Sequence, residues 1–302
     1  MIKTKIAVIG ASSMVGSRFY ELAEDDFDLI KADLNGENPI DITNSKSVED
    51  FFQNHGFDLA ILFSAYTDVE GAQKQKGDKN GPCWQINVEG TKNVAGACRK
   101  FHKRLIFVST DFVFDGVEGP SAEDKPTQKD YEKISWYGAS KVEAEKIIQE
   151  ILPESVILRI AYPYRSRYEA KDDIAKRYLK LYRDQKMYPV FTDQLITPTF
   201  IDDLAPAIKL LVEKGVNGIF HVASPKVVTQ YNFAKKTIEV FGGDPNTIPK
   251  GSILEFLKNP EVTPRPINGG LKTEKIQALG FTPTSWDKGI EIINGQSKGK
   301  LI

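Results

Sequence analysis

Tyr137 and Lys141 are the two residues whose types and spacing most directly predict chemistry. They lie four positions apart, so on a helix their side chains would be neighbours on one face. The following residues, 142–148, are good helix formers with apolar residues at helical spacing, which favours that helix. An ammonium beside a phenol would stabilise the phenolate and lower the pKa of Tyr137 from about 10. The pair therefore predicts proton transfer to a carbonyl oxygen, although Tyr-x-x-x-Lys also occurs by chance on ordinary exposed helices.

The composition is that of a globular protein that acts on small molecules. A chain of 302 residues is long for one compact core, so we expect one large domain or two unequal ones. A formal net charge of −1 argues against a nucleic-acid surface, which needs an excess of clustered Lys and Arg. No apolar run approaches membrane-spanning length, and the run before Gly10 is too short for a secretory signal. We therefore expect a cytoplasmic protein with no membrane or nucleic-acid partner.

The cysteines and histidines predict neither a disulfide nor a metal site. Cys83 and Cys98 fall in a segment that reads as one helix, where fifteen residues would separate them by about 22 Å. That separation is well beyond the roughly 7 Å limit for a disulfide, so both should be free thiols. The three histidines are scattered without the spacing of a zinc site.

A glycine-rich turn near the N-terminus predicts a dinucleotide site. The apolar run 6–9 ends in Gly10, and a helical pattern begins shortly after Gly16. A strand, a tight turn and a helix in this order hold a pyrophosphate at the helix N-terminus. The candidate contacts in this turn are Gly10, Ser12, Ser13, Met14, Val15 and Gly16. A plain strand-to-helix turn is the alternative, because two glycines six apart are weak evidence alone.

Asp33 ends the next apolar run, about 20 residues beyond the glycine turn. An acidic residue at this place binds the ribose 2′-hydroxyl of NAD and would repel the 2′-phosphate of NADP. NAD or NADP is therefore the expected cofactor, with NAD slightly favoured. The alternative is a solvated Asp at a strand end.

The remaining apolar runs predict an α/β fold with a doubly wound parallel sheet. They alternate with helix-like segments and cover residues 6–9, 28–33, 58–63, 104–108, 155–160 and 218–222. Ligands of such sheets lie beyond the carboxyl ends of the strands. Residues 64–66 and 109–111 follow two of these ends.

A change of pattern after residue 161 predicts a second, smaller domain. Residues 162–199 are rich in Tyr, Arg and Lys without strand alternation, and residues 230–241 and 253–257 read as helices. We expect a dinucleotide-binding domain over residues 1–161, to which about 200–223 return. A discontinuous substrate domain would comprise 162–199 and 224–302.

Several segments together resemble the extended short-chain dehydrogenase/reductase superfamily, and within it the dTDP-4-dehydrorhamnose reductases. The resemblance covers nearly the whole chain. Besides the glycine turn and the Tyr137/Lys141 pair, it rests on Asp41-Ile42-Thr43, Ala65-Tyr66-Thr67-Asp68-Val69, Asn87-Val88, the run from Ser109 to Gly116, Asp193-Gln194, Thr197-Pro198-Thr199-Phe200 and Arg265-Pro266-Ile267-Asn268.

The resemblance implies an NAD(P)H-dependent reductase of a 4-keto sugar nucleotide, in which Thr110, Tyr137 and Lys141 are catalytic. Thr110 would hold the keto oxygen, Tyr137 would protonate it, and Lys141 would also bind the nicotinamide ribose. It further implies cofactor contacts at Asp41, Ile42, Ser64, Ala65, Tyr66 and Asn87. The implied substrate contacts are Thr110, Asp111, Phe112, Tyr162 and Arg265. A homodimer is compatible with this assignment.

Three positions depart from the family pattern. Ser13 replaces a glycine where the backbone should approach phosphate. The segment after Arg159, usually Thr-Ser-Trp-Val-Tyr-Gly, is here Ile-Ala-Tyr-Pro-Tyr-Arg. Phe112 stands where the family usually has tyrosine. We expect Ser13 to adopt an ordinary conformation with its hydroxyl turned toward phosphate, so that the cofactor site stays functional.

Three other functions remain alternatives. Nucleotide-sugar 4,6-dehydratases have an acidic residue after Thr-Asp, whereas Phe112 cannot transfer protons. Sugar 4-epimerases usually carry serine where this chain has Thr110. A non-catalytic regulatory subunit resembling methionine adenosyltransferase β could retain Tyr137 and Lys141, because fold and motif do not fix function.

Overall fold

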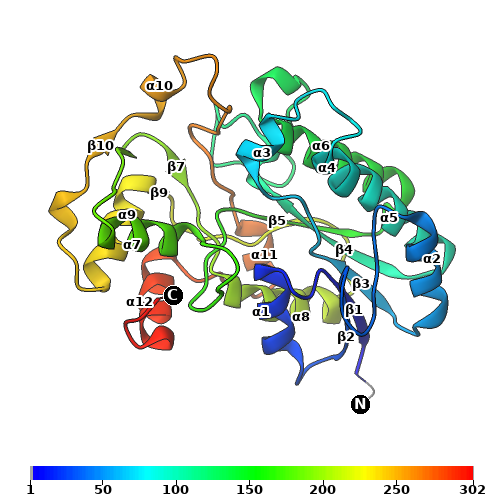
Figure 1. The fold of residues 1–302 in the computed structure, drawn as a ribbon. Coiled ribbons are helices and arrows are strands. Elements are labelled where there is room, and N and C mark those ends of the chain that lie inside the picture. Colours follow the sequence, from blue (N-terminus) through cyan, green and yellow to red (C-terminus); the bar gives the residue numbers. More distant parts are fainter. Residues whose placement is uncertain (1–2, 302) are drawn as a thin grey trace.

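A six-stranded parallel sheet forms the centre of the protein (Figure 1). The structure is a computed structural model that describes residues 3–301. The strands, in the spatial order β2-β1-β3-β4-β5-β8, are β1 (Lys5–Ile9), β2 (Asp28–Ala32), β3 (Leu59–Leu62), β4 (Arg104–Thr110), β5 (Val156–Ile160) and β8 (Gly218–His221). Every neighbouring pair is parallel, which confirms the doubly wound fold.

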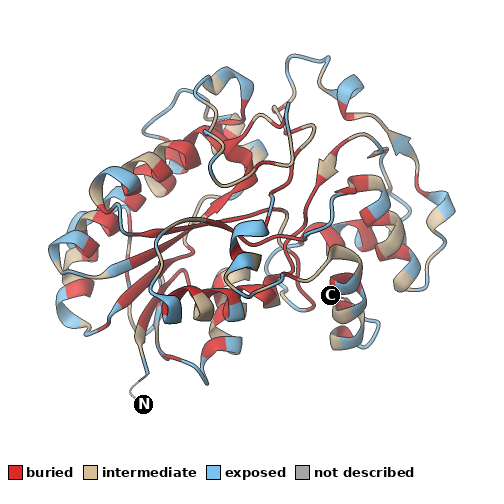
Figure 2. Cartoon of the chain, turned by 180° about the vertical axis from the view of Figure 1, so that it is seen from behind, coloured by how far each residue is buried: buried red, intermediate tan, exposed pale blue. Residues whose placement is uncertain are grey.

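Helices cover both faces of this sheet. α1 (Met14–Ala23), α8 (Leu204–Lys214) and α11 (Glu274–Ala278) pack on one face, and α2 (Ser45–Asn54), α5 (Thr91–Lys100) and α6 (Trp136–Ile151) pack on the other. Side chains alternate along β1: Ile6 and Val8 join the first core, and Ala7 and Ile9 join the second. The central strands β1 and β3 are buried on both faces and almost wholly apolar, which is why they read as continuous apolar runs (Figure 2 shows the burial). The edge strand β2, in contrast, exposes Asp28 and Lys31.

The strand order places a switch point between β1 and β3. The chain goes from β1 to β2 on one side and then crosses to β3 on the other. Open α/β sheets bind their ligands at such a switch point, in the crevice between the loops that leave the carboxyl ends of the two strands, here the loops after β1 and β3.

A second group of elements lies beyond that carboxyl edge (Figure 1). It contains α7 (Ile174–Arg183), α9 (Gln230–Val240), α10 (Ile253–Phe256) and α12 (Trp286–Ser297), with the short strands β6 (Val190–Phe191), β7 (Leu195–Ile196), β9 (Val228–Thr229) and β10 (Lys250–Gly251). Most of these elements share a hydrophobic cluster that includes Tyr164, Tyr178 and Phe233. This separate cluster supports two domains, which we retain as a proposal. α11 lies in the range assigned to the substrate domain, but it packs on the central sheet through Ile276.

The segment that carries both cysteines is helical but irregular. It runs through α4 (Pro82–Trp84), a π-helical turn (Gln85–Gly90) and α5, and both thiols are buried and free. A short helix, α3 (Val69–Gln73), precedes it. No helix within residues 3–301 is both long enough and apolar enough to cross a membrane.

Candidate active site

The first turn of α6 carries Tyr137, and the next turn carries Lys141, as predicted. Ser135 caps this helix, because its hydroxyl accepts a hydrogen bond from the Gly138 N–H at 3.1 Å. A Cβ on Gly138 would lie 2.3 Å from the carbonyl oxygen of Phe112. The glycine therefore lets the start of α6 approach the loop after β4 more closely than any other residue would.

Thr110 ends β4 and brings its hydroxyl to the Tyr137 side of that loop. Its Oγ1 accepts a hydrogen bond from the Phe112 N–H at 3.3 Å and caps a 3₁₀ turn over Asp111–Val113. The predicted catalytic residues thus converge where the carboxyl end of β4 meets the N-terminus of α6. Their roles remain proposals.

The described contacts of the Lys141 ammonium are with other groups than Tyr137, so its expected electrostatic effect on Tyr137 remains a proposal. The Lys141 ammonium donates a hydrogen bond to the Val108 carbonyl at 2.8 Å and lies over the Phe107 ring, 3.8 Å from its centroid. Burial raises the pKa of Tyr137, and the side chain that opposes this shift is Thr110. Burial also lowers the pKa of Lys141 to about 7. Helical spacing brings the two residues to one face, but the contacts of the neighbouring strand set the direction of the ammonium.

Three of the predicted substrate residues surround Tyr137. The Phe112 ring packs edge-on against Tyr137 at 5.9 Å and lies 6.2 Å from the Tyr162 ring. Asp111 is buried, one of its carboxylate oxygens has no hydrogen-bond partner among the described residues, and burial raises its pKa to about 7. The buried Tyr162 hydroxyl is also unpartnered within residues 3–301. An apolar wall with unsatisfied polar groups is suited to orienting a small polar ligand.

Arg265, the remaining predicted substrate residue, approaches the site from the C-terminal part of the chain. Its guanidinium pairs with the Glu70 carboxylate on α3, and Thr263 donates a hydrogen bond to the same carboxylate. The structure therefore brings Arg265 beside Phe112 and ties it to α3 through Glu70, an acidic residue that sequence reasoning did not select.

The glycine turn has the geometry of a phosphate cradle. Gly10 has φ +89°, and a Cβ there would lie 2.5 Å from the Ser64 N. A Cβ on Gly16 would lie 2.3 Å from the Gly10 carbonyl oxygen, so this glycine allows close packing of helix on strand. Ser13 takes an ordinary extended conformation, and its hydroxyl accepts a hydrogen bond from the Gly16 N–H at 3.0 Å. The conformation expected for Ser13 is confirmed, and its contact with phosphate remains a proposal. Met14 and Val15 form the first turn of α1.

Asp33 and Ser12 lock the turn to the end of β2. One Asp33 carboxylate oxygen accepts hydrogen bonds from the Ser12 N–H at 2.8 Å and from its hydroxyl at 2.5 Å. The other oxygen accepts the Leu34 N–H at 2.9 Å. Asp33 thus lies at the end of the strand, where the sequence predicts it, and the carboxylate oxygen that accepts the Leu34 N–H retains a second acceptor site.

The remaining predicted cofactor residues occupy the loops after β2 and β3. Asp41 accepts hydrogen bonds from the Thr43 N–H and hydroxyl, and Ile42 is buried beneath the π-helical turn against Gly90. Ser64, Ala65 and Tyr66 follow β3 directly. The Asn87 side chain accepts from the Tyr66 N–H at 2.8 Å and donates to the Tyr66 carbonyl at 3.1 Å, so it fixes this loop.

Ser140 is a positioning residue that sequence reasoning missed. Its hydroxyl accepts a hydrogen bond from Asn87 at 2.9 Å and donates to the Tyr137 carbonyl at 2.7 Å. It thereby joins the catalytic helix to the loop after β3. A serine between Tyr137 and Lys141, next to helix-forming residues, was the available signal.

Comparison with known proteins identifies the family. The chain matches the family described as RmlD substrate binding domain over residues 4–296. It is 30% identical over 272 residues to a probable low-salt glycan biosynthesis reductase of Haloferax volcanii, which covers 85% of this chain and 87% of the relative. It is also 30% identical over 283 residues to a dTDP-4-dehydrorhamnose reductase of Mycobacterium tuberculosis, with 92% and 88% covered.

Solved structures agree with this assignment. A dTDP-4-dehydrorhamnose reductase of Bacillus anthracis, solved in complex with NADP, superimposes with a TM-score of 0.85 at 25% identity, covering 98% of this chain and 100% of that one. A UDP-glucose 4-epimerase of Thermotoga maritima superimposes with a TM-score of 0.79 at 20% identity, covering 98% and 99%, which shows a shared fold. The resemblance inferred from the sequence is confirmed: the chain belongs to the RmlD substrate-binding domain family.

Proposed function

We propose that the protein is an NAD(P)H-dependent reductase of a 4-keto sugar nucleotide, as the reductases in its family are named. The observation that carries the proposal is the convergence of Tyr137, Thr110 and Lys141 at the carboxyl end of β4. This edge of the sheet also holds the glycine cradle, so a cofactor and a substrate carbonyl can meet there.

The residues at the switch point fit a nicotinamide dinucleotide. Gly10 lets the turn pack directly against the Ser64 backbone, because a Cβ there would lie 2.5 Å from the Ser64 N, and the turn leads straight into the N-terminus of α1. The free N–H groups of that helix end favour a pyrophosphate. Asp33 would accept the ribose hydroxyls at the β2 side, which favours NAD over NADP in our proposal.

Within this site the chain's residues have separate tasks. The reduced nicotinamide, when bound, supplies the hydride. Tyr137 donates its phenolic proton to the carbonyl oxygen, and Thr110 holds that oxygen by a hydrogen bond. Since burial alone disfavours the phenolate that remains, the Lys141 ammonium must turn from the Val108 carbonyl toward the ribose and Tyr137 to stabilise it.

The wall formed by Phe112 and Tyr162 supports reduction over dehydration. The Phe112 ring packs on Tyr137 in the position where a dehydratase needs a group that transfers protons. Asp111 and the Tyr162 hydroxyl would meet the sugar hydroxyls, and Arg265 would meet the charged part of the substrate. A homodimer remains a prediction that sedimentation would test.

A screen of 4-keto sugar nucleotides tests the proposal. For each candidate substrate, oxidation of NADH or NADPH is measured as the loss of its absorbance. We expect substrate-dependent oxidation of NADH or NADPH that stoichiometrically yields the 4-hydroxy product. If no 4-keto sugar nucleotide drives oxidation while a partner enzyme co-purifies with the protein, the reductase function is wrong and the regulatory alternative is favoured.

A further inference from the structure

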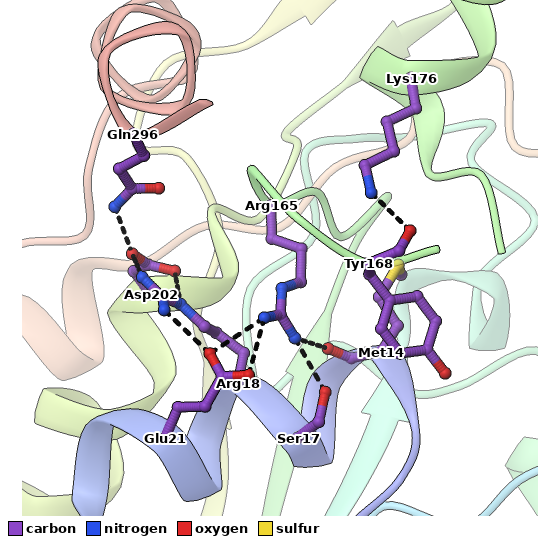
Figure 3. Close-up of polar contacts among 9 residues, drawn as sticks. All are labelled: Met14, Ser17, Arg18, Glu21, Arg165, Tyr168, Lys176, Asp202 and Gln296. Carbon is purple, nitrogen blue, oxygen red and sulfur yellow. Dashed lines mark hydrogen bonds and ion pairs between the residues drawn. The ribbon is translucent and has the colours of Figure 1, made fainter. Parts of the chain in front are cut away.

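The segment after β5 departs from the family pattern as far as Arg165, and the residues from Arg165 onward form a strap across the loops that follow β1 and β3. We define the strap as residues 165–171. Arg165 anchors its start: the buried guanidinium donates to the Met14 carbonyl at 3.1 Å and the Ser17 hydroxyl at 2.8 Å, and pairs with Glu21 at 3.1 Å (Figure 3). All three partners belong to α1, the helix that begins at the glycine turn.

The rest of the strap spans the switch point. The Tyr168 hydroxyl donates to the Ser12 carbonyl in the glycine turn at 2.9 Å. Three residues later, the Lys171 ammonium donates to the Thr67 hydroxyl in the loop after β3 at 2.7 Å. Lys176 of α7 holds the Tyr168 carbonyl (Figure 3). The strap therefore joins the two loops between which a ligand at this switch point must lie.

The cations of the strap differ in how far their charge is satisfied. Arg165 has the Glu21 carboxylate, and Arg167 donates to the Gln296 carbonyl in the last turn of α12, the negative end of that helix. Lys171 has a neutral hydroxyl as its hydrogen-bond partner, and no carboxylate within residues 3–301 forms a salt bridge with it. The Asp68 carboxylate is near enough to oppose the fall that burial causes in the pKa of Lys171, but it forms no salt bridge with the ammonium, which can still bind an anion.

We propose that Lys171 is a ligand of the cofactor pyrophosphate, which the strap brings over the glycine turn. Lys171 reaches Thr67 after β3, whereas Asp33 lies after β2, on the opposite side of β1. The ammonium is therefore remote from the edge that binds the adenosine ribose. It lies on the β3 side of the switch point between β1 and β3, where a pyrophosphate crosses.

This assignment also explains how the chain tolerates Ser13. The serine adds a side chain to the turn and uses its hydroxyl as an acceptor from Gly16, so the turn offers phosphate less backbone than a glycine would allow. A lysine from the opposite side supplies a charge-assisted hydrogen bond instead. The inference rests on the proposed function, because it presumes a dinucleotide at the switch point.

Calorimetric titration with NADH, NADPH and dTDP tests the proposal on the wild type, Lys171→Met, Lys171→Arg and Lys180→Met. Lys180 is the matched control: it is exposed on α7 and pairs with Asp172, away from both loops. We expect Lys171→Met to weaken NADH and NADPH to similar extents, about tenfold or more, since one charge-assisted hydrogen bond is lost. Lys171→Arg should restore most of the affinity, and Lys180→Met should match the wild type. Affinity for dTDP should not change.

Each other result has a definite meaning. If Lys171→Met binds both cofactors as the wild type does, the inference is wrong and the reductase proposal stands. If only the affinity for NADPH falls, Lys171 binds the 2′-phosphate; if only the affinity for dTDP falls, it binds the substrate. Either result overturns the pyrophosphate assignment. A wild type that binds neither cofactor at millimolar concentration overturns the inference and the proposed function together. Thermal unfolding of each variant confirms that it is folded.

Discussion

Replacing Glu145 by glutamine should strongly destabilise the protein, because Glu145 neutralises a buried arginine behind the active site. The Arg159 guanidinium on β5 makes two hydrogen bonds to the Glu145 carboxylate on α6, at 2.9 and 2.6 Å. Both side chains are at most 3% exposed. Arg159 also lies over the Phe114 ring and beside His221. Burial and the charge of Arg159 together lower the pKa of His221 to about 3, so this histidine is neutral. No second carboxylate within residues 3–301 forms a salt bridge with the guanidinium.

Breaking a buried ion pair from one side costs about 3–5 kcal/mol. For a chain of 302 residues, whose unfolding entropy is about 0.6 kcal/mol/K, we expect the Tm of Glu145→Gln to fall by roughly 5–8 °C. Glu145 also raises the pKa of Lys141, one turn earlier on α6. The variant should therefore lower the pKa of Lys141, because a carboxylate that favours the ammonium is gone. If the pH profile of turnover shows a step due to Lys141, that step should move to lower pH.

Urea and thermal unfolding measure the effect, with Glu143→Gln as control. Glu143 lies two residues earlier on the same helix and pairs with Lys146 at 2.8 Å, but its side chain is 28% exposed. The same substitution there should cost at most about 1 kcal/mol. The double variant Glu145→Leu/Arg159→Met should be more stable than Glu145→Gln, since it buries no unpaired charge. A loss below about 1 kcal/mol for Glu145→Gln would refute the reasoning.

Three further predictions follow from the geometry of the site. Gly138→Ala should lower the free energy of unfolding by about 1–3 kcal/mol and reduce turnover, because the added Cβ would meet the Phe112 carbonyl oxygen at 2.3 Å. Gly96→Ala on α5 is the control, because open space surrounds Gly96 and we expect neither effect there. Equal stabilities of the two variants would show that the close approach does not matter. The folded-state pKa of Asp111, about 7, lies above its ordinary value of 3.8, so its stabilising contribution is present at low pH and lost as the pH rises through 7. Asp111→Asn should therefore match the wild type near pH 4 and exceed its free energy of unfolding at pH 8, by up to about 4 kcal/mol; a constant difference across this range would contradict the assigned pKa. Titration should give a lower Kd for NADH than for NADPH, because Asp33 would repel a 2′-phosphate, and the reverse order would remove Asp33 from the ribose site.

The sheet and the catalytic helix could be predicted because their signals are local. The strands of the sheet are mostly apolar because the central ones are buried on both faces, and the six runs are separated by helices, so strand identity and parallel pairing follow together. The first turn of α6 was marked by the Tyr137/Lys141 spacing, and α9 and α10 were found to within one residue of their ends.

The parts that could not be predicted depend on contacts between distant segments. The direction of the Lys141 ammonium is set by the Val108 carbonyl, 33 residues earlier, which helical spacing cannot reveal. The π-helical turn that presents Asn87 to Tyr66 has no signature in the local pattern. The strap requires that Lys171 meet Thr67, 104 residues away, and only the folded chain brings them together.

The central claim is that the Tyr137 hydroxyl delivers the proton to a sugar carbonyl. The most direct test compares turnover of wild type and Tyr137→Phe with a 4-keto sugar nucleotide, together with the Kd of each for the cofactor. The account predicts that turnover falls by about 10² to 10⁴-fold, since only the proton donor is lost, while the cofactor Kd stays nearly unchanged. Wild-type turnover by Tyr137→Phe with a confirmed substrate would contradict it.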